Sequence, residues 1–147
     1  RRDIMEKLSP VGGVYQAGTM SGNPVVMAAG MATLNILKAN QGIYDHINKL
    51  GEKLQNGIED IAREKGIKLT VNRVGGMMTV FFTDRNPVRT YEDAKSCDLE
   101  MFRKYFLHMN KNGFNIPQSQ FESMFLSAVH TEEHIDKFLE TFKRFQP

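Results

Sequence analysis

The sequence has little cysteine, little net charge and no long hydrophobic run. Its single cysteine among 147 residues, Cys97, excludes an internal disulfide and a cysteine-based metal cluster, and it fits a reducing compartment. The 19 basic and 17 acidic side chains leave a net charge of only +2, which argues against a nucleic acid or an acidic membrane as a partner. No apolar stretch is long enough to span a bilayer, and no charged-then-apolar leader opens the chain. We therefore expect a cytoplasmic protein.

Low-complexity segments and internal repeats are also absent, and 147 residues suit a globular domain. Apolar residues at helical spacing predict a one-faced helix over residues 43–62 that ends at Gly66. Residues 67–71 and 77–83 have the composition of strands, and the pair of glycines between them, Gly75 and Gly76, allows a hairpin turn.

The second half of the chain predicts further helices and short strands. Asp98 and Thr131 are suited to begin two helices, while residues 114–116 and 124–128 are expected to form short strands. Residues 90–94 are expected to form a loop or short turn. The fold class predicted from these elements is α+β, with a small antiparallel sheet of three to four strands and helices on one face. The side chains expected to face inward are Leu99, Phe102, Phe106 and Met109 in one helix and Ile135, Phe138, Leu139, Phe142 and Phe145 in the other.

A polar loop that contains glycine, residues 15–24, leads into a helix expected to begin at Pro24. The first N–H groups of a helix lack internal partners, and its dipole is positive at that end. Gly18 and Thr19 would add a backbone N–H and a hydroxyl there, which together suit a phosphate or a carboxylate. The alternative is an ordinary capped helix after a tight turn.

The helix that follows, residues 25–37, is apolar nearly all round. Helices of this kind are normally buried on every side, so we expect protein outside this chain to cover it. Because the chain opens on Arg1 rather than on methionine, we expect it to be part of a longer protein.

Two histidines and one glutamate in the last third are candidate functional residues. The spacing of His130 and His134 suits a metal, but Thr131 should place His130 outside the helix and no third ligand is evident, so no metal site is expected. Glu122 lies in a polar connection, where a loop can present a carboxylate to a site on a rigid frame. The alternative for Glu122 is an ordinary surface position.

Three segments taken together, residues 15–24, 113–122 and 127–133, strongly resemble the glutamate-1-semialdehyde 2,1-aminomutases. These are fold-type-I pyridoxal-phosphate enzymes related to the class III aminotransferases. The resemblance covers essentially the whole chain and corresponds to the C-terminal third of the family. It implies that residues 1–40 are the end of a large domain with an interdomain segment, and that residues 41–147 are a small C-terminal α+β domain.

The resemblance to this family implies an enzymatic activity for the full-length protein. The family enzyme is an isomerase that converts glutamate 1-semialdehyde to 5-aminolevulinate in porphyrin biosynthesis, with the pyridoxamine form of the cofactor as amino donor. By this resemblance, Gly18 and Thr19 contact the cofactor phosphate of a neighbouring subunit, and Glu122 orients the substrate. The Schiff-base lysine would precede Arg1, so the fragment alone is expected to bind no cofactor and to be inactive.

The resemblance also implies a homodimer, and a contact of the full-length protein with glutamyl-tRNA reductase. Two alternatives stay open at this point. One is a fragment of a class III pyridoxal-phosphate-dependent ω-aminotransferase, from which the segment Ser119–Glu122 separates the aminomutases. The other is a non-catalytic interaction domain that uses the apolar helix as a docking surface.

Overall fold

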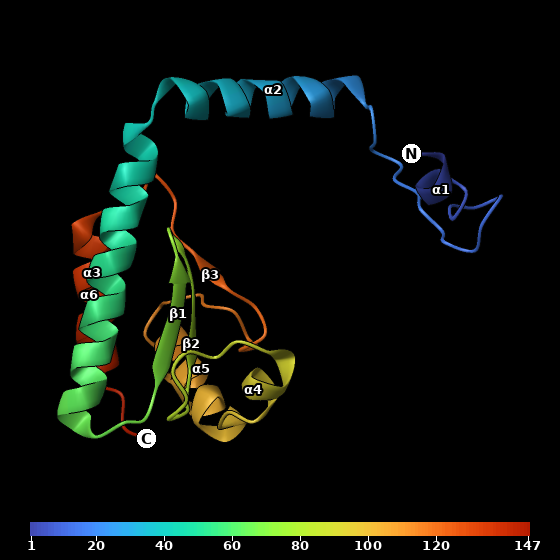
Figure 1. Cartoon of the computed structure of the whole chain (residues 1–147). Coiled ribbons are helices and arrows are strands. Elements are labelled where there is room, and N and C mark those ends of the chain that lie inside the picture. The colour runs from blue at the N-terminus through green and yellow to red at the C-terminus, as the bar shows by residue number, and fades with distance from the viewer. The chain divides into compact units, whose positions relative to one another are not determined.

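The computed structural model describes all 147 residues (Figure 1). Its contacts divide the chain into two compact units, Arg1–Asn40 and Gln41–Pro147. The first unit contains the short helix α1 (Arg2–Met5) and the longer helix α2 (Pro24–Ala39). Helix α2 begins at Pro24, as predicted, and none of its residues is buried. No helix of the chain has the length and hydropathy needed to cross a membrane.

The second unit is built on a three-stranded antiparallel sheet in the order β1-β2-β3. Strands β1 (Thr70–Val74) and β2 (Met77–Phe81) form the predicted hairpin. The turn between them requires glycine, since Gly75 has a φ of +60°. The predicted β1 begins three residues too early, whereas β2 begins where it was predicted.

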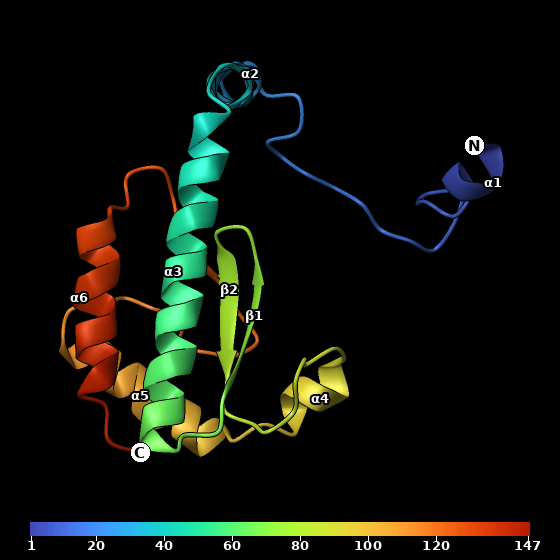
Figure 2. The ribbon, with the colours of Figure 1, turned by 60° about the vertical axis from the view of Figure 1, so that its left-hand side comes forward.

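Helices α3 (Gly42–Lys65) and α6 (Glu132–Lys143) lie side by side against this sheet (Figure 2). Helix α3 ends, as predicted, at Gly66 in the left-handed conformation. Thr131 is the N-cap of helix α6 and forms a capping box with His134. Asp98 is the N-cap of helix α5 (Leu99–Lys111), and its carboxylate accepts the N–H of Met101 at 2.8 Å. Both predicted caps are confirmed.

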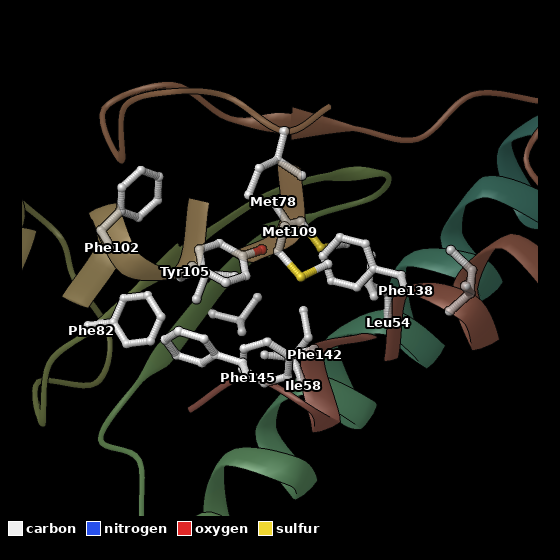
Figure 3. Close-up of a cluster of buried hydrophobic side chains, with 14 of the residues drawn as sticks. Leu54, Ile58, Met78, Phe82, Phe102, Tyr105, Met109, Phe138, Phe142 and Phe145 are labelled. Carbon is white, nitrogen blue, oxygen red and sulfur yellow. The ribbon is translucent and has the colours of Figure 1, made fainter. Parts of the chain in front are cut away.

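The core between the sheet and α3, α5 and α6 is rich in aromatic rings (Figure 3). Tyr105 lies at its centre, with its ring centroid 5.6 Å from that of Phe82 and 5.8 Å from that of Phe142. Each large side chain buried in this way contributes about 1.5–3 kcal/mol to stability. Four of the predicted core residues of the last helix are buried, namely Ile135, Phe138, Phe142 and Phe145.

Residues 90–94, predicted as a loop or short turn, instead contribute to helix α4 (Tyr91–Lys95). The reason is a capping box, in which Thr90 accepts the N–H of Asp93 and Asp93 accepts the N–H of Thr90. Leu99 was predicted to face inward but is 49% exposed. Tyr105, which was not predicted to face inward, is 1% exposed.

The two short strands predicted after α5 were largely wrong. Residues 114–116 form no strand, because the N–H of Phe114 bonds to the carbonyl of Met109 at the end of α5 and that of Ile116 bonds to Phe114. The strand predicted over residues 124–128 is reduced to β3 (Met124–Phe125). Phe125 already pairs with Met77, the first residue of β2, so there is no strand beyond it to pair with.

Candidate functional site

The loop before α2 holds Gly18 and Thr19 in a tight turn. The N–H of Ser21 donates to the carbonyl of Gly18 at 3.0 Å. A Cβ at residue 18 would lie 2.5 Å from the Ser21 Oγ, so a larger residue at this position would require the Ser21 side chain to rotate away. The N–H groups of Gly18 and Thr19 and the Thr19 hydroxyl have no partner within the chain. These three donors are therefore available to an external acceptor.

The start of α2 is less open to an anion than its sequence predicts. Pro24 has no N–H, and the N–H groups of Val25 and Val26 both donate to the Asn23 Oδ1, at 3.0 and 3.2 Å. The N–H of Met27 donates to the Asn23 carbonyl. The expected free donors of the helix are thus already satisfied, and what an anion would meet is the Gly18–Thr19 turn together with the helix dipole.

The second unit contains a cavity of about 780 Å³. Its apolar lining comes from the core, and its polar lining comes mainly from the connection between α5 and α6. Glu122 lines this cavity and is exposed to solvent. The lining residues used below are Leu54, Met78, Glu122, Ser123, His130 and His134.

Glu122 is held by its backbone, while its carboxylate is free. Its N–H donates to the Ser119 carbonyl at 3.1 Å, and the N–H of Phe121 donates to the Ser119 Oγ at 3.1 Å. These bonds form a compact turn. The Glu122 carboxylate makes no hydrogen bond or ion pair within the chain. Glu122 therefore presents an uncompensated acceptor at the cavity, in the second unit, whereas Gly18 and Thr19 belong to the first.

His130 and His134 also line this cavity, which the sequence did not reveal. The Nδ1 of His130 accepts the N–H of Ser127 at 3.0 Å, and the Nδ1 of His134 accepts the N–H of Thr131 at 3.1 Å. An Nδ1 that accepts leaves the proton of a neutral ring on Nε2. Both rings thus serve local turns and caps. The chain has no group of three or more His, Cys, Asp or Glu side chains placed to hold a metal ion.

The nucleophilic side chains of the chain are in structural or solvated settings. No lysine is buried. Lys53 bonds to Asp136 at 2.6 Å, and this hydrogen bond raises the pKa of its ammonium group, opposite to what a nucleophilic amine requires. Lys65 donates to the backbone carbonyl of Phe145. Burial raises the pKa of the Cys97 thiol, which donates to a carbonyl of α4.

Two curated proteins that are similar to this chain in sequence are glutamate-1-semialdehyde 2,1-aminomutases. The chain is 65% identical over 146 residues to a glutamate-1-semialdehyde 2,1-aminomutase of Clostridium perfringens, and the match covers 99% of the chain and 34% of that protein. It is 65% identical over 145 residues, with the same coverage, to the protein of that name from Clostridium botulinum. The chain thus spans about a third of the length of the curated relatives it matches.

Solved structures with a similar fold include an ω-transaminase from Sphaerobacter thermophilus, with a TM-score of 0.70 and 22% identity, over 97% of this chain and 33% of that one. A β-phenylalanine aminotransferase from Variovorax paradoxus matches with a TM-score of 0.66 and 25% identity, over 99% of this chain and 33% of that one. The three-stranded sheet with its helices is thus part of the transaminase fold. Residues 1–145 match the family described as aminotransferase class-III. The chain therefore belongs to the class-III aminotransferase family.

Proposed function

We propose that this chain is the C-terminal third of a pyridoxal-phosphate-dependent glutamate-1-semialdehyde 2,1-aminomutase. The observation that carries this proposal is the 65% identity over 99% of the chain to proteins of that name. The transaminases of similar fold are only 22–25% identical. A class III ω-aminotransferase and a docking domain are therefore less well supported.

The residues present fit the phosphate end of the cofactor. The three free donors of Gly18 and Thr19 can bind phosphate oxygens, and the positive end of α2 favours an anion beside them. The chain offers no desolvated lysine to hold the other end. When bound, the cofactor, in the pyridoxamine form as proposed here, would supply the group that donates and recovers the amino nitrogen. The role of Gly18 and Thr19 is to hold its phosphate in place.

Glu122 is proposed to orient the substrate. Glutamate 1-semialdehyde carries an ammonium group and a carboxylate. The unpaired carboxylate of Glu122 attracts the first and repels the second. Because Glu122 is fixed by its backbone turn, this preference selects one direction of the bound molecule. Glu122 therefore acts through charge and position, and we do not assign it a proton-transfer step.

The proposed enzyme is a cytoplasmic homodimer in which the Gly18–Thr19 turn of one subunit binds the phosphate in the site of its neighbour. A hybrid-dimer assay tests this arrangement. Subunits with Thr19→Val are mixed with subunits that lack the cofactor lysine. If the turn acts across the interface, each hybrid has one intact site and activity is restored. If the turn acts within its own subunit, no site is intact and the mixture stays inactive.

A contact of the full-length protein with glutamyl-tRNA reductase stays a prediction.

Turnover by the full-length enzyme tests the function itself. Conversion of glutamate 1-semialdehyde to 5-aminolevulinate should proceed without any external amino acceptor, since the reaction is intramolecular. The matched measurement supplies an ω-amine with pyruvate as acceptor. Transfer to pyruvate without formation of 5-aminolevulinate would assign the chain to an ω-aminotransferase. Absence of both reactions in a cofactor-loaded protein would favour the docking domain.

A further inference from the structure

The turn that carries Glu122 is anchored on one side by a buried amide. Gln120 is only 1% exposed, and its Nε2 donates to the carbonyl of Ala94 at 2.7 Å. Ala94 is the second-last residue of α4. A second contact joins the same two elements, since the rings of Tyr91 and Phe121 lie 5.7 Å apart between centroids. The short helix α4 is thus a support for the Glu122 turn.

The other side of the turn is anchored to the sheet. The Ser123 hydroxyl is 3.0 Å from the hydroxyl of Thr79 in β2, and either atom can donate. Thr79 is buried and lies within the β1–β2 ladder. Glu122 therefore lies between two anchors, Gln120 and Ser123, that hold the backbone on both sides of it while its own carboxylate stays free.

Stability alone does not account for a glutamine at position 120. Its Oε1 is buried and has no hydrogen-bond partner, so burial costs desolvation with no bond in return. The Ala94 carbonyl also accepts the N–H of Cys97 at 3.2 Å and would keep a partner without the glutamine. An apolar side chain of the same length would remove the unpaired oxygen and keep the volume.

On the basis of the aminomutase function proposed above, we propose that Gln120 is a positioning residue for Glu122. Its amide fixes the turn to the end of α4, and this sets the direction in which the Glu122 carboxylate meets the substrate. A misplacement of about 1 Å at a reacting centre can lower a rate by roughly 100-fold. Gln120 itself does not touch the substrate in this account.

The test uses the full-length holoenzyme with Gln120→Met, Glu122→Gln and the double variant, assayed for 5-aminolevulinate. The single Gln120→Met variant should lose about 10- to 100-fold in kcat, with an unfolding temperature within about 3 °C of wild type. Its loss should not add to that of Glu122→Gln, because both act on one carboxylate. Gln55→Met is the matched control, since Gln55 is half-buried and its amide is hydrogen-bonded to Glu59, Val71 and Arg73, away from the Glu122 turn. It should keep the wild-type kcat.

Gln120→Leu provides a second variant at the same position should Gln120→Met fail to fold, and a similar loss of kcat is expected because it removes the same amide contact to Ala94. Full kcat in whichever of these two variants folds would overturn the inference. Losses that multiply with that of Glu122→Gln would do the same, since they indicate a general structural role. A wild-type holoenzyme that forms no 5-aminolevulinate would overturn the proposed function and this inference with it.

Discussion

Replacing Gly51 by alanine tests how closely α3 packs on the β1–β2 turn. Gly51 is buried in the middle of α3. A Cβ there would lie 2.5 Å from the carbonyl oxygen of Gly75. This oxygen cannot easily move, because it accepts from the Arg73 Nη1 at 2.9 Å and Gly75 itself has a left-handed conformation. The helix and the turn would have to separate by about 1 Å to reach ordinary contact.

Two effects of opposite sign decide the outcome of Gly51→Ala. Alanine in a helix interior is favoured over glycine by about 1 kcal/mol. Overpacking costs about 1–3 kcal/mol, and weakening the Arg73–Gly75 hydrogen bond adds about 1 kcal/mol. The clash therefore wins, and we expect a net destabilisation of about 1–3 kcal/mol. At about 4 °C per kcal/mol for a domain of this size, the melting temperature should fall by about 4–12 °C.

Thermal unfolding of the chain, followed by circular dichroism, measures this change. Gly57→Ala in the same helix is the matched control. A Cβ at residue 57 would meet the methyl groups of Leu139 at 2.5 and 2.6 Å, but these are the end of a side chain that can turn aside. Its melting temperature should stay closer to that of the wild type. A Gly51→Ala variant as stable as wild type, or more stable, would refute the close packing of α3 on the turn.

Three further predictions concern stability and pH. Thr131→Ala removes the capping box with His134 and should cost about 1 kcal/mol in urea unfolding, whereas Thr131→Ser should cost much less. Phe142, which is 0% exposed, should cost about 3–5 kcal/mol when replaced by alanine, and a smaller change would contradict its central place in the core. Hydrogen bonds from the N–H groups of Arg89 and Thr90 lower the pKa of Asp93 below its usual 3.8. Asp93 therefore stabilises α4 above that value and loses this contribution as the pH falls through the lower folded pKa. The urea midpoint followed from about pH 5 to about pH 2 should show a pH-dependent part that Asp93→Asn removes, and an unchanged profile would contradict it.

Local patterns predicted much of the fold. Gly66, Asp98 and Thr131 are each at the helix end that their side chains favour, and the glycines at 75 and 76 turn the hairpin. Errors arose where long-range pairing decides the outcome. The length of β3 depends on where its partner β2 begins, which residues 124–128 alone do not encode. Helix α4 was missed because it is very short, although the capping box that begins it is local in the sequence.

The candidate site was predictable as separate parts rather than as an arrangement. The polar loop identified Glu122, and the turn before α2 identified Gly18 and Thr19. The burial of Gln120 was not evident, since glutamine is usually exposed and its partner Ala94 lies 26 residues away. Likewise, the place of His130 at the cavity depends on how the connection after β3 folds back.

A chimaeric enzyme tests the central claim most directly. The matching third of the Clostridium perfringens aminomutase would be replaced by this chain, to which it is 65% identical. The chimaera, loaded with cofactor, would be assayed for 5-aminolevulinate from glutamate 1-semialdehyde, with Glu122→Gln in parallel. We predict activity within about tenfold of the parent enzyme, and a clear loss in the Glu122→Gln chimaera. A folded, cofactor-loaded chimaera that forms no 5-aminolevulinate would contradict the proposal that this chain is the C-terminal third of an aminomutase.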